Sequence, residues 1–138
     1  MTIDTTPPLS TSELDSFCAG SLPPSAIMGI ECFNRGEFFA AHEHLEDAWR
    51  KDQSSCRELY RGILQVAVAY HHIQRGNYRG ARKMFQRCRL WLKPFPDICR
   101  GINLARLRQD IDRVDDELDK MAGISFPIDP SFFQPLDY

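Results

Sequence analysis

The spacing of apolar residues constrains the fold of this 138-residue chain more than any other feature of its sequence. Near the C-terminus these residues follow one another at steps of three and four positions: Leu104, Leu107, Ile111, Val114, Leu118 and Met121. This period matches the 3.6 residues of an α-helical turn and predicts a helix with one apolar face. Earlier segments show similar spacing, and none has the convincing period of two that marks a strand. The pattern therefore predicts an all-α protein.

Glycine, proline and capping residues mark the ends of five predicted helices. Proline breaks a helix, and glycine commonly follows its last turn. We expect helices at about 25–35 and 37–51, a third from Ser55 to Gly76, a fourth at about 77–93, and a fifth that ends at Gly123. Ser55 and Glu58 fit a capping box at the start of the third helix. The centre of that helix is apolar on nearly all sides, so we expect it to be the buried central helix.

The segments 35–41 and 75–81 resemble each other: each has a glycine turn, an aromatic residue two positions later and a small residue beyond it. The pattern resembles that of tetratricopeptide repeats, which are stacked helical hairpins. We therefore expect two stacked antiparallel hairpins with a fifth helix across them, forming a single domain at 25–123. A flexible N-terminal lead at 1–24 and a Pro/Phe-rich tail at 124–138 complete the chain. Three phenylalanines indicate that the tail packs on the domain: Phe126, Phe132 and Phe133.

The composition indicates one folded domain. The chain is 43% hydrophobic and 26% charged, which excludes a wholly disordered protein. No apolar run approaches the ~18 residues that a membrane helix needs, and the N-terminus lacks the apolar region of a signal peptide. The five cysteines form no CxxC pair, and their odd number predicts free cysteines that fill the core of a cytoplasmic protein.

A net charge of −2 conceals a strongly basic segment. Residues 75–100 contain eight basic residues and one acidic residue. The outer face of the predicted fourth helix therefore offers a candidate anion-binding patch, made of Arg79, Arg82, Lys83 and Arg87. The fifth helix is acidic and is an equally good partner for these cations, so we do not expect nucleic acid to bind. The sequence leaves open whether the chain forms a homo-oligomer or binds a protein partner.

The densest polar cluster lies on the second predicted helix. His42 and Glu46 are four residues apart and share one helical face, so they could hold one divalent metal such as zinc. Glu43 would then be the general base that activates a metal-bound water. His71, on the third helix, is the candidate third ligand. Trp49 lies on the same stripe as His42 and Glu46.

A structural role explains the same residues. If the second and third helices are antiparallel, Arg61 and Gln65 lie opposite the cluster, whereas His71 lies ~8–12 Å further along the axis. Glu46 would then pair with Arg61, and His42 with Gln65, in a partly buried polar network. His71 would be a core histidine.

Two segments carry longer motifs: FNxGxFFxxHExLExxW at 33–49 and GxxQxAxAxHHxxxGNxxGA at 62–81. Residues 26–92 thereby resemble a widespread prokaryotic family of unknown function that is often labelled a predicted metal-dependent hydrolase. The resemblance implies a compact all-α fold of helical hairpins. It marks five residues as matching the signature: His42, Glu43, Glu46, Trp49 and His71. Two functions follow as alternatives, a metal-dependent hydrolase and a non-enzymatic, tetratricopeptide-like interaction module.

Overall fold

The computed structural model describes residues 9–121 and 128–138, and in these ranges the protein is mostly helical. Six α-helices follow one another: α1 (Thr11–Cys18), α2 (Pro24–Asn34), α3 (Phe38–Lys51), α4 (Glu58–Gln74), α5 (Tyr78–Leu92) and α6 (Leu104–Lys120). The short 3-10 helices are η1 (Ser55–Arg57) and η2 (Pro130–Phe132), and the antiparallel two-residue strands are β1 (Ile98–Cys99) and β2 (Ile102–Asn103). The predicted all-α class is confirmed. The strands are too short for a period-2 pattern to predict them.

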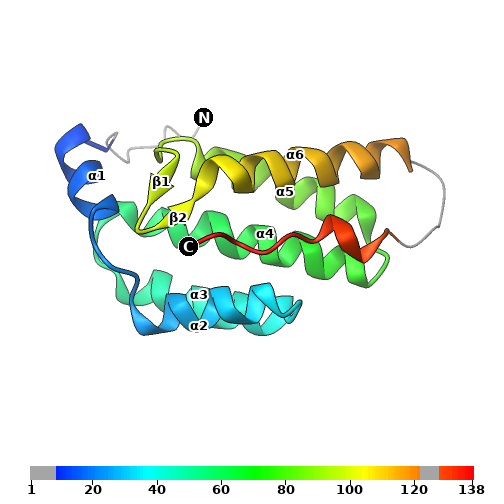
Figure 1. Cartoon of the computed structure of the whole chain (residues 1–138), viewed down its shortest axis with the longest axis horizontal. Helices are drawn as coiled ribbons and strands as arrows, with labels where there is room; N and C mark the ends of the chain where they lie inside the picture. The colour runs from blue at the N-terminus through cyan, green and yellow to red at the C-terminus, as the bar shows by residue number, and fades with distance from the viewer. Residues whose placement is uncertain (1–8, 122–127) are drawn as a thin grey trace, which may run out of the picture.

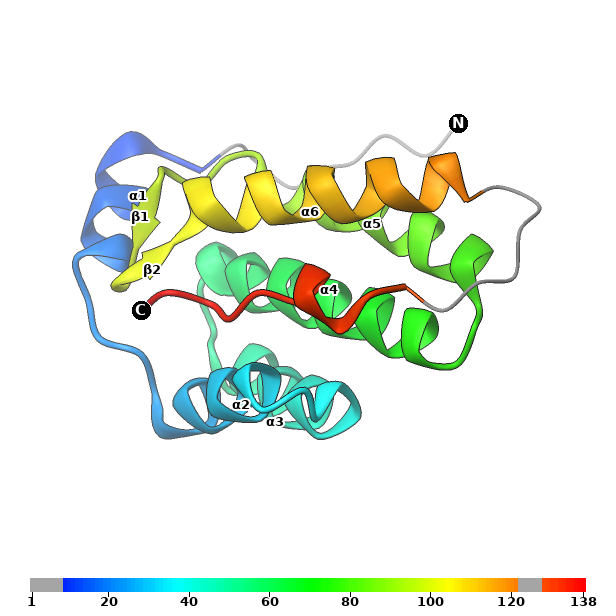
Figure 2. The same cartoon turned by 45° about the vertical axis from the view of Figure 1, so that its right-hand side comes forward.

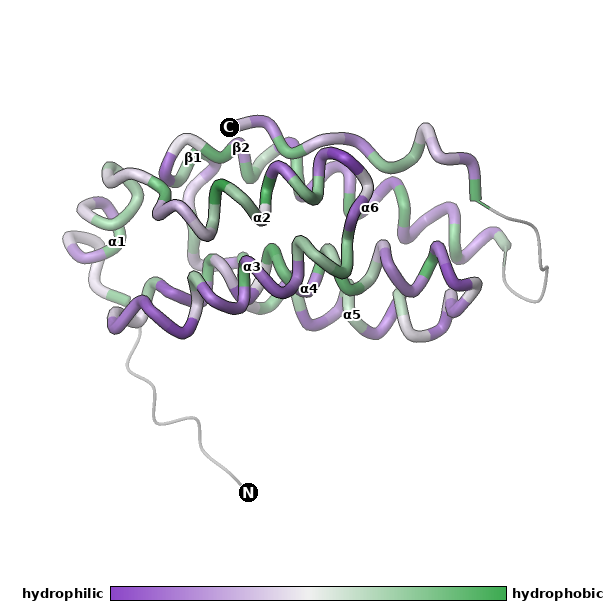
Figure 3. Tube along the Cα trace, turned by 90° about the horizontal axis from the view of Figure 1, so that it is seen from below, coloured by the Kyte–Doolittle hydropathy of each residue, from purple (hydrophilic) through white to green (hydrophobic). Residues whose placement is uncertain are grey.

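Helices α2–α6 form two layers, one behind the other in the view of Figure 1. The α2–α3 and α4–α5 hairpins stack through the contact between α3 and α4, so that α3, α4 and α5 form one layer. Figure 3 shows α2, the C-terminal segment and α6 in the second layer. Figures 1 and 2 show this C-terminal segment running between α2 and α6, across α4. Helix α4 is therefore covered on three sides, as expected of a central helix.

The two hairpin turns have the same geometry, which explains the sequence similarity between them. Gly36 and Gly76 have φ angles of +80° and +75°, a region that residues with a Cβ atom rarely adopt. In the first turn the Glu37 amide donates to the Cys32 carbonyl at 2.9 Å, and in the second the Asn77 amide donates to the His72 carbonyl at 2.8 Å. These bonds close each helix with a Schellman motif.

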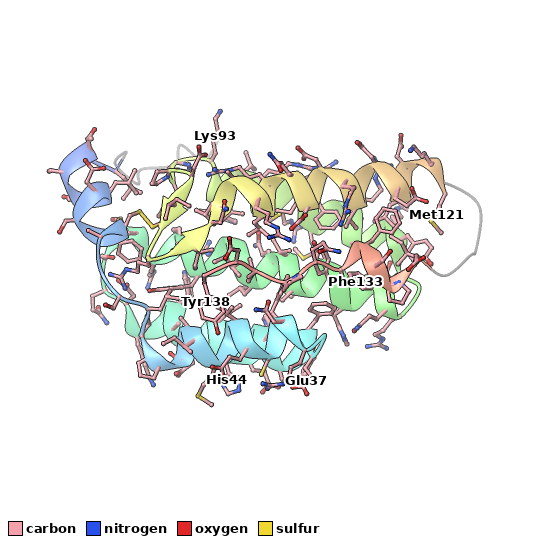
Figure 4. All side chains as sticks on the ribbon, viewed as in Figure 1. Glu37, His44, Lys93, Met121, Phe133 and Tyr138 are labelled. Atoms are coloured by element: carbon pink, nitrogen blue, oxygen red, sulfur yellow. A yellow bond between two sulfur atoms is a disulfide. The ribbon has the colours of Figure 1, made fainter. Side chains whose placement is uncertain are left out.

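An aromatic cluster joins α4 to the C-terminal segment. Tyr70 is fully buried, and its ring contacts those of Phe33, Phe38, Phe85 and Phe133 at centroid distances of 5.0–6.1 Å. Figure 4 shows Phe133 on the C-terminal segment. Burial raises the pKa of the Tyr70 hydroxyl well above its usual range, and no described residue forms a hydrogen bond with it.

Hydrogen bonds to its backbone hold the rest of this segment in place. The Asn34 side chain accepts from the Leu136 amide at 2.8 Å and donates to the Leu136 carbonyl at 3.2 Å. The Asn103 amide donates to the Asp137 carbonyl at 2.8 Å. Phe126, which we also expected to pack, lies outside the described residues, and the division into lead, domain and tail stays a prediction.

Part of the predicted flexible lead is an ordered helix. Phe17 of α1 is buried, and Arg100 packs over its ring at 3.6 Å from the centroid. A disulfide joins Cys18 to Cys99, so the expectation of five free cysteines is wrong; Cys32, Cys56 and Cys88 are free and buried. Because two of the cysteines form a disulfide, the cysteine pattern no longer supports the prediction of a cytoplasmic protein. None of the described helices is long and apolar enough to span a membrane.

Candidate functional site

The predicted site residues lie on the side of the α3–α4–α5 layer that faces away from the C-terminal segment. On α4, Arg61 and Tyr70 are nine residues apart, which is two and a half helical turns, so they point in opposite directions. Tyr70 contacts the C-terminal segment, and Arg61 therefore faces away from it. We call this surface the outer face; it contains Phe39, His42, Glu46, Trp49, Arg61, His71 and Trp91.

His42, Glu46 and Arg50 form a line of contacts along α3. His42 Nε2 lies 3.3 Å from one carboxylate oxygen of Glu46, and Arg50 donates to the other. The side chains of His42 and Glu46 are 29% and 32% exposed. The predicted pair between Glu46 and Arg61 is wrong, because Arg50 lies one turn away on the same helix and is the nearer cation.

Arg61 instead joins three helices. Its Nε lies 2.7 Å from a Glu58 oxygen, and its guanidinium lies over the rings of Trp49 and Trp91 at 4.7 and 4.3 Å from their centroids. Arg57 also lies over Trp49, at 4.6 Å. We call this arrangement the Trp–Arg stack. Cation–π contacts of this kind contribute ~0.5–2 kcal/mol each, so the stack helps to hold α3, α4 and α5 together.

Glu58 has a different role from the one that the sequence suggests. Trp49 Nε1 donates to one of its oxygens at 3.5 Å, and Arg61 contacts the other. No side chain caps the start of α4, so the predicted capping box with Ser55 does not form. The predicted bond between His42 and Gln65 is also missing: Gln65 Oε1 is buried and has no hydrogen-bond partner among the described residues.

His71 lies near His42 but is not part of a metal-ligand cluster. The Phe39 ring contacts both imidazoles, at centroid distances of 6.3 Å to His42 and 5.6 Å to His71. Burial, followed by the nearby charge of Arg75, lowers the pKa of His71. Within residues 9–121 and 128–138, no three His, Cys, Asp or Glu side chains are grouped to hold a metal ion.

The donor set on the outer face does not fit a zinc centre. Zinc sites in proteins use three or four ligands, whereas His42 and Glu46 provide two and no third candidate is grouped with them among the described residues. Glu43 is exposed, as expected for a residue off the apolar stripe. The ligand roles of His42, Glu46 and His71 and the catalytic role of Glu43 stay predictions.

One residue of the predicted basic patch on α5 is paired within the protein. Arg82, together with Arg89 outside the patch, turns toward α6, and the two arginines form ion pairs of 2.8–3.0 Å with Asp112, Asp115 and Asp119. The other three residues of the patch, Arg79, Lys83 and Arg87, are exposed, and no carboxylate of the described residues lies within 4.0 Å of them. The prediction that Arg82 is part of an anion-binding patch is therefore wrong, because Asp115 and Asp119 already pair with it.

Comparison with known proteins follows the motifs. Residues 26–84 match a domain of unknown function (DUF309). An uncharacterized protein of Aquifex aeolicus (strain VF5) is 32% identical over 83 residues, which cover 59% of this chain and 25% of that protein. The uncharacterized protein YpuF of Bacillus subtilis (strain 168) is 39% identical over 56 residues, which cover 40% of this chain and 32% of that protein.

This chain thus spans about a quarter to a third of the length of these relatives. The DUF309 match includes both hairpin turns and the His42 cluster but ends within α5. Trp91 and its contact with Arg61 lie beyond it. The motifs alone therefore could not have revealed the Trp–Arg stack, and neither relative carries a stated activity.

Proposed function

We propose that this protein is a non-enzymatic helical interaction module and that its His/Glu cluster is a structural polar network. The observation that carries the proposal is the pairing of the cluster's charges. Glu46 lies between His42 and Arg50, and Glu58 is paired with Arg61. A metal bound at Glu46 would displace Arg50, and no third His, Cys, Asp or Glu of the described residues joins His42 and Glu46 to complete a metal site.

The composition of the outer face also supports this role. Trp and Arg dominate binding hot spots in protein interfaces, and this face presents Trp49, Trp91 and Arg61 together. Phe39, beside the two histidines, is 58% exposed. The aligned residues cover only 25% and 32% of the two relatives, as expected if this helical module is joined to other segments in those proteins.

The competing proposal is the metal-dependent hydrolase, with His42, Glu46 and His71 as ligands and Glu43 as base. It requires Arg50 to leave Glu46 and a third ligand to approach. Metal analysis separates the two proposals, because a structural network has no need of a metal.

The experiment uses full-length protein purified without chelator, in three forms: wild type, His42→Ala and His44→Ala. His44 is a matched control on the same helix, at the outer edge of the molecule (Figure 4). We expect far less than one metal per chain by mass spectrometry in all three. About one metal per chain in wild type and His44→Ala, lost in His42→Ala, would establish a metal site at His42 and overturn the structural network.

A further inference from the structure

The solvent side of α5 carries a row of cations. Arg79, Lys83 and Arg87 are four residues apart, which places neighbours ~6 Å from one another along the helix axis. All three are exposed. Arg75, at the end of α4 and before the turn into α5, is exposed as well. Like charges at this spacing repel one another, so the row destabilises an isolated α5.

Acidic residues are available nearby but do not reach this row. Asp112, Asp115 and Asp119 of α6 pair with Arg82 and Arg89 on another side of α5. For Arg79, Lys83 and Arg87 the described parts of the chain supply no carboxylate within ion-pair distance. An anionic group from outside the chain would relieve the repulsion among them.

An exposed leucine extends the row. Leu90 follows Arg87 by three residues, so the steps of four, four and three place these side chains along one line of the helix. Leu90 is 72% exposed, the highest value among the large hydrophobic side chains of residues 9–121 and 128–138. We call the line formed by Arg79, Lys83, Arg87 and Leu90 the α5 edge.

The α5 edge fits an acidic protein helix better than nucleic acid. Phosphates gain nothing from an exposed leucine, whereas an amphipathic helix offers both carboxylates and an apolar side chain. Non-specific binding of single strands relies on free aromatic rings. On α5 itself, the guanidinium of Arg61 already lies over the ring of Trp91.

We propose that the α5 edge docks an acidic amphipathic helix of a partner protein. The partner helix would lie beside α5 and extend the row α3–α4–α5. Its carboxylates, one turn apart, would face Arg79, Lys83 and Arg87, and an apolar side chain would cover Leu90. This inference rests on the proposed function, since it names the partner of the interaction module.

The test measures binding of a fluorescent synthetic helix by anisotropy. The probe has about five turns, with glutamates one turn apart and leucines on the same face; a second peptide has glutamine in place of every glutamate. The protein variants are Arg79→Glu/Arg87→Glu and, as a control with the same change in net charge, Arg106→Glu/Lys120→Glu. Arg106 and Lys120 are exposed on α6, and neither forms an ion pair with a described residue.

We expect the glutamate peptide to bind wild type and control equally, and the α5 variant at least about tenfold more weakly. Binding should weaken with added salt, and Leu90→Ser should reduce it without any change in charge. Circular dichroism confirms that each variant is folded.

Three results would overturn the inference. The glutamine peptide could bind as tightly as the glutamate peptide, both double variants could lose binding equally, or the glutamate peptide could fail to bind. A single-stranded RNA of about 20 nucleotides that binds more tightly than the peptide would assign the row to nucleic acid. None of these results changes the metal content, so the interaction module is judged separately by its own experiment.

Discussion

Gly62 allows α4 and α5 to approach closely. A Cβ atom at this position would lie 2.6 Å from Cδ2 and 2.7 Å from Cγ of Leu92, which is itself 1% exposed. In Gly62→Ala the displaced Leu92 should cost ~1–3 kcal/mol, and the better helix propensity of alanine should return up to ~1 kcal/mol. We expect a net loss of about 1 kcal/mol, measured by urea unfolding.

Gly76→Ala is the matched comparison for this prediction. Gly76 has a positive φ angle, but a Cβ atom there would meet nothing within 4 Å, so its cost is backbone strain alone. Gly76→Asn should recover part of that cost, because asparagine tolerates the left-handed region, whereas Gly62→Asn should be worse than Gly62→Ala. Equal stability of wild type and Gly62→Ala would contradict the close contact.

His71 should make the protein less stable in mild acid. Burial and the charge of Arg75 lower the pKa of His71 in the folded protein, below the value of about 6.5 expected when it is unfolded. The unfolded chain therefore binds the proton more readily, and stability is lost as the pH falls through this range. The free energy of unfolding should drop more between pH 7.5 and 5.5 for wild type than for His71→Gln. An equal drop in both would show that His71 is not responsible.

Helix α1 is linked covalently and by hydrogen bonds to the β1–β2 hairpin. Besides the Cys18–Cys99 disulfide, Arg100 donates to the Phe17 carbonyl at 2.8 Å and to the Tyr60 hydroxyl at 2.9 Å. Arg100 has a φ angle of +49°, which is uncommon for a residue with a side chain, and these contacts hold it in that conformation.

The disulfide can be tested by counting thiols. Protein denatured without reductant should react with three equivalents of a thiol reagent, and with five after reduction. In the folded protein all three free thiols should react slowly: they are buried, and burial raises the pKa of Cys88 to about 12. Five reactive thiols in denatured, unreduced protein would contradict the disulfide.

The C-terminal segment should contribute substantially to stability. Phe133 contacts Phe38 and Tyr70, at 5.4 and 5.0 Å between ring centroids. Phe133→Ala removes both contacts and opens the space over α4, so we expect a loss of ~2–4 kcal/mol in the free energy of unfolding. Tyr138→Ala is the control, since Tyr138 is 51% exposed and its loss should cost little. Equal losses in both variants would mean that the segment does not pack on α4.

At the scale of the whole molecule, the sequence determined the helices well because their signals are local. The apolar period and the glycines at 36 and 76 act within one or two turns. The disulfide was missed because Cys18 and Cys99 are 81 residues apart, and no local pattern connects them. The 3-4 spacing of α6 likewise located the helix, but its ion pairs to α5 depend on how the two helices pack.

The candidate site was predicted less completely. The sequence located most residues of the outer face, though not Trp91, and it did not predict their partners correctly, because a long side chain can reach several neighbours. Glu46 lies within reach of a cation on its own helix, and Arg61 lies near Glu58 on its own helix. Spacings of four residues for Glu46 and Arg50 and of three for Glu58 and Arg61 could have predicted both pairs. We predicted a pair between two helices, Glu46 with Arg61, where a partner on the same helix was nearer.

We propose that the outer face is a structural network and not a metal centre. A metal that binds only the folded protein raises its melting temperature, by an amount that grows with concentration above Kd. The most direct measurement is therefore the melting temperature of wild type with chelator and with added zinc. We expect the two values to agree within about 1 °C, because among the described residues no third ligand joins His42 and Glu46. A rise of several degrees with zinc that His42→Ala abolishes and His44→Ala retains would contradict the claim.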